Sequence, residues 1–274
     1  MNNPTVLIWC GNQPNQIALS CKIAEKFNLI GIVAESKRKK KKISLKIFIK
    51  IYHKLLFKKV DNAWFGLLKY YKSKYPKFPE TELLITNDIN SDEVYSFSQK
   101  KKPDLIIVSG THLIKGKLLN LSPSIGILNL HTGISPYIKG GPNCTNWCLS
   151  NDEFHLIGNT IMWLNEEIDG GRIISTEFVE FTGKEDLKEI HFKVMESAHN
   201  LYLRSIEKVL SNPSGYKGIK QEEIGASKLY SSKKWGCNQK RRLLFNIRGN
   251  RFYEIVNSEK YKKEKDKIKL VELK

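Results

Sequence analysis

Two polar side chains, Asn129 and His131, stand two positions apart at the end of the apolar run IGILNLH (125–131). In a β-strand, residues at i and i+2 point to the same face, so this spacing brings a carboxamide and an imidazole together. Both groups can then converge on one reacting atom, which is uncommon inside an apolar run. The structural alternative is that the two side chains make capping or loop hydrogen bonds.

The elements that must position these residues alternate between strands and helices. We expect strands at 5–10, 28–34, 82–88, 104–110, 125–131, 155–164 and 171–181, and helices at 16–27, 91–101, 115–121, 141–151 and 185–210. This alternation predicts an α/β fold with an open, mostly parallel central sheet flanked by helices. Sites in such sheets form beyond the carboxyl ends of the strands. Asn129 and His131 end one predicted strand, and Asp169 lies in the loop after another.

Several short motifs follow in a fixed order. They are Asn129-x-His131, a loop with Pro136 and Gly140, Gly158-x-Thr160, and Asp169-x-Gly171-x-Ile173. This series resembles the folate-dependent formyltransferase family, which includes the glycinamide ribonucleotide, methionyl-tRNA and sugar N-formyltransferases. The resemblance covers residues 80–210 well, the first two strands loosely and the C-terminal segment barely. It implies a Rossmann-like formyltransferase fold.

The resemblance also implies that Asn129, His131 and Asp169 are catalytic. In formyl transfer an amine attacks the formyl carbon, and the carbonyl oxygen becomes an oxyanion. Asn129 and a His131 N–H can supply the hydrogen bonds that stabilise this oxygen, and each such donor contributes about 3 kcal/mol. Asp169 can orient the imidazole and take the proton of the amine.

The formyl donor implied by the family is 10-formyltetrahydrofolate. Its pterin ring is expected against the segment before the N-x-H strand and against the loop that carries Asp169. These positions are Leu113, Ile114, Glu167, Ile168 and Gly170. No metal is expected. The remaining histidines are interpreted as surface or local hydrogen-bonding residues: His53, His112, His155, His191 and His199.

The acceptor is expected to be the amine of a nucleotide-linked amino sugar, which would give an N-formylated sugar for cell-surface glycans such as lipopolysaccharide. The segment HTGISPY (131–137) is most similar to the sugar branch of the family. Thr132-Gly133 replaces the usual Pro-Ser, and Met162 replaces a frequent His, which leaves the acceptor open. Substrate contacts are assigned to Tyr137, Lys139 and Gly140. Methionyl-tRNA, glycinamide ribonucleotide or water, in a formyltetrahydrofolate hydrolase, are the alternatives.

The charge is unevenly distributed. The net charge is +18, and residues 37–77 hold 15 Lys or Arg against one acid. We divide the chain into a catalytic domain (1–212), with a basic helical insertion at about 36–80, and a basic C-terminal extension (213–274) with a frayed tail. A solvated Lys face is the favoured interpretation of the helix at 42–58, weak contact with a membrane surface the alternative, and nucleic-acid binding less favoured.

Other features bear on location and assembly. The five cysteines are scattered, and no apolar run approaches the roughly 18 residues of a membrane span. The N-terminus lacks the features of a signal peptide. We therefore expect a cytoplasmic protein. A homodimer built through a sheet edge or the C-terminal segment is a further expectation.

Overall fold

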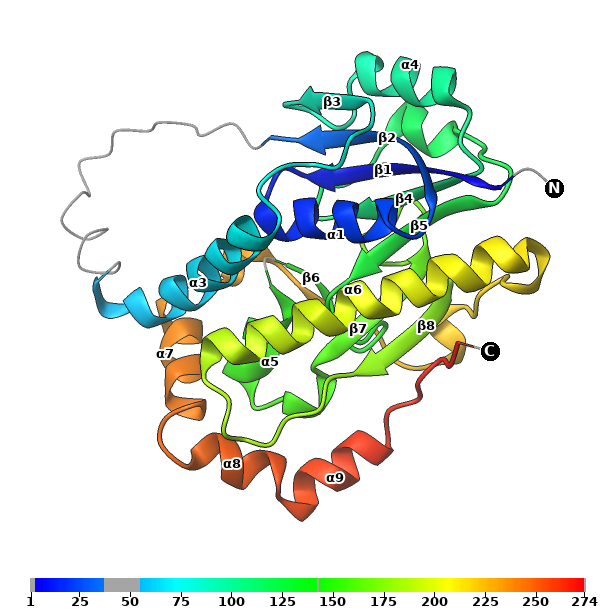
Figure 1. Ribbon diagram of the computed structural model, residues 1–274. Helices are drawn as coiled ribbons and strands as arrows, with labels where there is room; N and C mark the ends of the chain where they lie inside the picture. Colours follow the sequence, from blue (N-terminus) through cyan, green and yellow to red (C-terminus); the bar gives the residue numbers. More distant parts are fainter. Residues whose placement is uncertain (1–2, 37–54, 142, 274) are drawn as a thin grey trace.

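A seven-stranded sheet forms the centre of the computed structural model, which describes residues 3–36, 55–141 and 143–273 (Figure 1). The strands are β1 (Thr5–Gly11), β2 (Asn28–Glu35), β3 (Leu83–Thr86), β4 (Leu105–Ser109), β5 (Gly126–His131), β7 (Gly158–Trp163) and β8 (Ile173–Phe178), in the order β3-β2-β1-β4-β5-β7-β8. The pairs from β3 to β5 are parallel, whereas β7 and β8 are antiparallel to their neighbours. The mostly parallel sheet predicted from the sequence is confirmed.

Helices pack on both faces of this sheet and beside it. They are α1 (Pro14–Ala24), α3 (Lys58–Lys74), α4 (Asp92–Lys101), α5 (Cys144–Asn151), α6 (Leu187–Ser211), α7 (Cys237–Asn246), α8 (Arg251–Val256) and α9 (Glu259–Asp266). The helix expected at 115–121 is a short 3-10 turn, Gly116–Asn120. Most of the basic helix expected at 42–58 lies outside the described residues.

The alternation of side chains along β1 explains the two layers. Val6 and Ile8 point into a core that contains side chains of α1 and α6, whereas Leu7 and Trp9 pack with α4 on the other side. All four are at most 1% exposed. A parallel strand that is buried on both faces reads as a continuous apolar run, which is why 5–10 was recognisable.

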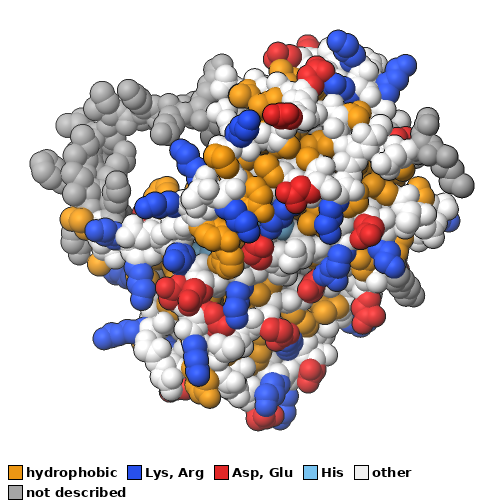
Figure 2. Space-filling view, in the orientation of Figure 1, with side chains coloured by type: hydrophobic (Ala, Val, Ile, Leu, Met, Phe, Trp, Pro, Cys, Tyr) orange, Lys and Arg blue, Asp and Glu red, His pale blue; other side chains and the backbone are white. Residues whose placement is uncertain are grey.

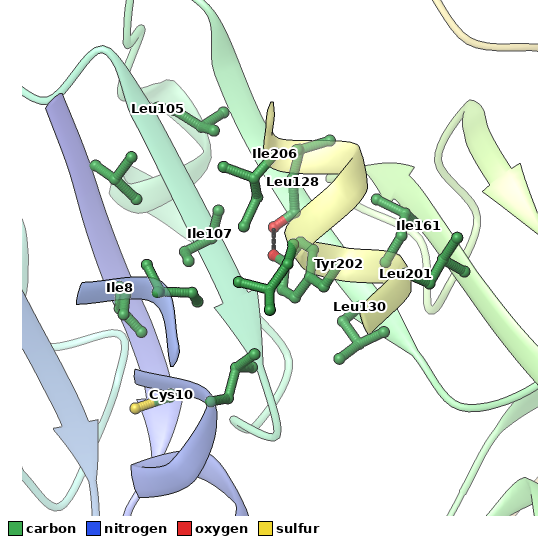
Figure 3. Packing of buried hydrophobic residues seen from close by; sticks show 14 of the residues in the cluster. Ile8, Cys10, Leu105, Ile107, Leu128, Leu130, Ile161, Leu201, Tyr202 and Ile206 are labelled. Carbon is green, nitrogen blue, oxygen red and sulfur yellow. Dashed lines mark hydrogen bonds between the residues drawn. The ribbon is translucent and has the colours of Figure 1, made fainter. Parts of the chain in front are cut away.

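Tyr202 of α6 joins β4 to β5 from inside the first core (Figure 3). Its hydroxyl accepts a hydrogen bond from the Val108 N–H at 3.0 Å and donates to the Leu128 carbonyl at 2.8 Å. Complete burial raises the pKa of Tyr202 well above its usual value, so the hydroxyl keeps its proton. Through these bonds α6 fixes β4 to β5 at Leu128, the residue that precedes Asn129.

The C-terminal segment, defined here as residues 213–273, packs against the rest of the chain. Leu243 and Phe252 are at most 2% exposed and belong to a core with residues of α5. Near the end, the Val271 N–H donates to the Thr176 hydroxyl at 2.7 Å, and the Thr176 N–H donates to the Val271 carbonyl at 2.8 Å. The expected frayed tail is therefore wrong as far as residue 273, because apolar side chains and a strand partner fix it.

The surface in Figure 2 carries blue and red side chains in mixture over α1, α3 and α6. Several basic residues of the C-terminal segment are paired, including Lys228 with Glu153 and Lys265 with Glu180. Among residues 3–36, 55–141 and 143–273, no helix is long and apolar enough to cross a membrane.

Candidate active site

His131 and Asp169 form a close pair at the carboxyl end of β5. The His131 Nδ1 lies 3.2 Å from an Asp169 carboxylate oxygen, and the two side chains are 7% and 16% exposed. The other ring nitrogen, Nε2, lies 3.0 Å from the Ile138 carbonyl. Both ring nitrogens therefore have partners in the protein. A hydrogen bond from His131 to a reacting oxygen, as expected from the sequence, would require one of these partners to be exchanged.

The surroundings of His131 favour its charged form. Burial lowers the pKa of the ring, but the Asp169 carboxylate, the Cys144 thiol and the Ile138 carbonyl together outweigh burial and raise the pKa of His131 to about 10. With two N–H groups, the ring can donate both to Asp169 and to the Ile138 carbonyl. The site therefore contains a buried imidazolium–carboxylate pair near neutral pH.

Asn129 supplies the amide. It pairs with Val108 of β4 and with Met162 of β7, two positions before His131 on the same face of β5. Its carboxamide lines the same cavity as His131 and Asp169. Within the described part of the chain, the Asn129 side chain has no hydrogen-bond partner, so its N–H groups are available to a ligand. The three residues predicted from the motifs are thus brought together.

Thr160 fastens the loop that follows His131. Its hydroxyl donates to the Gly133 carbonyl at 2.6 Å and accepts from the Ser135 N–H at 3.0 Å. Thr160 is opposite His131 in the β5–β7 register, so the G-x-T motif has a structural explanation. Gly158 is needed because a Cβ there would lie 2.3 Å from the Glu177 carbonyl oxygen.

Asp169 is held in an unusual backbone conformation. Its φ is 49°, in the left-handed region that Asp tolerates better than most residues. One carboxylate oxygen accepts the Gly140 N–H at 2.9 Å. Gly140 itself has a φ of 89°, and a Cβ there would lie 2.2 Å from the Tyr230 carbonyl oxygen. A side chain at position 140 would therefore disturb the contact that orients Asp169.

A cavity of about 900 Å³ opens over these groups. Of the cofactor positions expected from the sequence, Leu113, Ile114, Glu167 and Ile168 line it, whereas Gly170 does not. The apolar side chains suit a flat ring, which fits a folate donor. A cluster of three or more His, Cys, Asp or Glu able to hold a metal ion is absent from the described ranges.

The three expected substrate contacts are placed differently. Gly140 lines the cavity, but Tyr137 and Lys139 do not. The Tyr137 hydroxyl donates to the Ile224 carbonyl at 3.4 Å and accepts from the Lys269 N–H at 3.1 Å, so it braces the C-terminal segment. Lys139 pairs with Leu229 through its backbone in the two-residue strands β6 (Lys139–Gly140) and β9 (Leu229–Tyr230).

Other cavity residues escaped the sequence reasoning. Asn15 lies in the first turn of α1, just after the loop that follows β1, and could have been found from the rule on strand ends. His191 of α6 is buried and lines the cavity, and its Nε2 has no partner in the described structure. His199, also buried, contacts the distant Lys22. The interpretation of these two histidines as surface or local hydrogen-bonding residues is wrong, because α6 turns them inward. Tyr230 reaches the cavity from a segment without a motif.

Solved structures with this fold define the class of protein. A sugar N-formyltransferase from a Shewanella species superposes with a TM-score of 0.56 at 15% identity, over 89% of this chain and 87% of that one. A phosphoribosylglycinamide formyltransferase from Anaplasma phagocytophilum gives 0.54 at 13% identity, over 77% and 89%. The architecture is therefore that of the formyltransferases.

The sequence comparison identifies the family. The profile of the Formyl transferase family matches residues 49–206, which is more than half of the chain, and the chain belongs to this family. Among curated proteins it is similar to the methionyl-tRNA formyltransferase of Clostridium tetani, with 29% identity over 131 residues. The match covers 48% of this chain and 42% of that relative, so the chain spans less than half the length of this relative.

Proposed function

We propose that the chain transfers a formyl group from 10-formyltetrahydrofolate to the amine of a nucleotide-linked amino sugar. The observation that carries this proposal is the His131–Asp169 pair, which lies beside the available Asn129 carboxamide in one cavity of about 900 Å³. A cavity of this size can hold both the reacting end of a folate and a sugar.

The three side chains divide the chemistry between them. The Asn129 N–H groups can donate to the carbonyl oxygen that gains negative charge as the amine attacks. The nearby His131 imidazolium stabilises that charge electrostatically. The Asp169 carboxylate, 16% exposed, can accept the proton that the amine loses. The bond between the formyl carbon and the donor nitrogen then breaks, and tetrahydrofolate leaves with a proton on that nitrogen. The Leu113 and Ile168 side chains provide apolar contacts for the ring of the donor.

Two observations support an amino sugar as the acceptor. The structural match to the sugar N-formyltransferase includes nearly the whole chain, and another neighbour, a sugar 3N-formyl transferase, was solved in the presence of dTDP and 5-N-formyl-THF. Lys233 and Lys240 line the cavity here and could approach phosphate groups. Methionyl-tRNA is the second candidate, because the curated relatives carry that activity in their names.

The test is release of tetrahydrofolate from 10-formyltetrahydrofolate with a panel of acceptors. The panel contains nucleotide-linked 3- and 4-amino sugars, glycinamide ribonucleotide, initiator Met-tRNA and buffer alone. Turnover with one amino sugar alone supports the proposal. Turnover only with Met-tRNA or glycinamide ribonucleotide would replace the acceptor, and turnover in buffer alone would indicate a hydrolase.

Other expectations from the sequence stay predictions. They are the cytoplasmic location, the role in lipopolysaccharide synthesis, the homodimer, the membrane contact through 42–58, and the division into residues 1–212 and 213–274. The packing of the C-terminal segment against α5 and β8 favours its treatment as a part of the catalytic unit.

A further inference from the structure

Gln221 connects the C-terminal segment to the loop of Asp169. It lies on a 3-10 turn (Gln221–Glu223), and its Nε2 donates to the Asp169 carbonyl at 2.7 Å and to the Gly171 carbonyl at 2.8 Å. Because both partners are acceptors, the amide must present its nitrogen to them. The side chain thus ties together the backbone on both sides of Gly170.

Gln221 contacts a loop with an unusual backbone conformation. Asp169 has a positive φ, and the adjoining Glu167 and Ile168 are exposed. Next to the loop, the Arg172 guanidinium donates to the Gly218 carbonyl, and Ile173 pairs with Ile219. The loop of Asp169 is therefore fastened to residues 218–221.

The same segment also holds the group that orients the Asp169 carboxylate. That group is the Gly140 N–H, which donates to Asp169 at 2.9 Å. The neighbours of Gly140 are fixed in turn, since the Lys139 N–H donates to the Lys228 carbonyl at 2.9 Å and the Gly141 N–H to the Tyr230 carbonyl at 3.0 Å. The C-terminal segment thus fixes both the backbone and the side chain of Asp169.

We propose that Gln221 is a positioning residue for the reaction, because it sets the Asp169 carboxylate in its place against His131. The inference rests on the proposed function for its effect on turnover. Gln221 does not line the cavity and is 5% exposed, so it acts through Asp169 and not on the substrates.

Asn246 of α7 offers a matched control. It is also 5% exposed, lies in the same C-terminal segment, and donates from its Nδ2 to the carbonyls of Leu149 at 2.8 Å and Ser150 at 3.4 Å. Gln221→Leu and Asn246→Leu therefore each remove one buried amide that bridges two backbone carbonyls, but only the first amide contacts the loop of Asp169.

The experiment compares kcat, KM and the urea midpoint of the two variants with those of the parent. We expect Gln221→Leu to lower kcat roughly 10- to 100-fold with KM values changed less than about threefold, since small misplacements of a catalytic group have effects of this size. Asn246→Leu should change kcat less than about twofold at a similar loss of stability. Equal kcat values in the two variants would overturn the proposal. Gln221→Asn, which keeps the amide but shortens its reach, replaces Gln221→Leu if that variant does not fold.

A second readout does not depend on turnover. The ¹⁵N NMR signals of the His131 ring report its contact with Asp169, and we expect them to change in Gln221→Leu but not in Asn246→Leu. If the parent has no transferase activity but these signals change as expected, the positioning role stands and the proposed function fails. Unchanged ring signals in Gln221→Leu would overturn the positioning role even if the parent is active.

Discussion

The molecule contains two imidazole–carboxylate pairs beside one cavity, and their burial is reversed. In the His131–Asp169 pair the imidazole is 7% exposed and the carboxylate 16%. In the His112–Glu35 pair the imidazole is 62% exposed and the carboxylate 2%, with 2.8 Å between Nδ1 and Oε1. In each pair, the more accessible member is the one that a ligand in the cavity can reach.

The partners of the two carboxylates explain the difference further. Glu35 also accepts hydrogen bonds from two backbone N–H groups, that of His112 at 2.7 Å and that of Ile89 at 3.2 Å. Its carboxylate therefore connects the loops that follow β3 and β4. In the described structure the Asp169 carboxylate accepts only the Gly140 N–H besides its contact with His131. An imidazole–carboxylate pair thus stabilises loops in the case of His112 and Glu35, whereas the carboxylate of the His131–Asp169 pair is left available to a ligand.

The largest expected effect comes from Asp169→Asn. The amide cannot take a proton from the amine, so we expect kcat to fall about 10³-fold, within the 10²–10⁴ range of general acid–base catalysis. Initial rates of tetrahydrofolate release measure this. Glu35→Gln is the control and should keep turnover within about tenfold. A greater loss in the control than in Asp169→Asn would reverse the assignment of the two pairs.

For stability, substitutions in the His112–Glu35 pair should have the larger effect. Glu35→Leu leaves the buried Ile89 N–H and the partly buried backbone N–H of His112 without an acceptor, which should cost about 2–4 kcal/mol of unfolding free energy. Urea denaturation followed by circular dichroism gives the value. His112→Ala leaves Glu35 buried but removes one partner and should cost about 1 kcal/mol. If the two variants were equally stable, Glu35 could not be the centre of the loop contacts.

The stability that the His131–Asp169 pair contributes should depend on pH. The folded pKa of His131, about 10, lies above the ordinary value of 6.5. The contribution of this pair is therefore fully present below pH 6.5 and is lost as the pH rises from 6.5 through 10. We expect the difference in unfolding free energy between the parent and Asp169→Asn to shrink over this range. A constant difference from pH 6.5 to 10.5 would contradict the charged pair.

A smaller effect than those of Asp169→Asn and Glu35→Leu is expected from Thr160→Val, which removes the hydrogen bonds that hold the loop after His131. The loss of two buried hydrogen bonds should cost about 1–2 kcal/mol, with kcat lowered a few-fold. Thermal unfolding and initial rates are the measurements. Thr182→Val, at an exposed position, is the matched substitution and should stay within about 0.5 kcal/mol.

The sequence predicted those parts of the molecule that depend on neighbours along the chain. The apolar runs of β1 and β4 indicated buried strands, and the spacing of Asn129 and His131 indicated a shared face. Asp169 could be predicted only from the family motif, since its neighbours in the sequence do not distinguish it from other acidic residues in loops. Glu35 was hidden because its partner Ile89 is 54 positions away, and Gln221 because Asp169 is 52 positions away. Contacts of this separation leave no periodic pattern.

The strand β9 and Gln221 come late in the chain, after Asn129, His131 and Asp169. During synthesis, a chain that has already exposed His131 and Asp169 still lacks the partners of Gly140 and of the Asp169 carbonyl. Since domains fold as their segments emerge, the sheet can assemble before these partners arrive. The geometry around Asp169 can therefore be completed only after residues 221–230 have been synthesised, and a product that is terminated before them would lack the contacts that hold Gly140 and the Asp169 carbonyl.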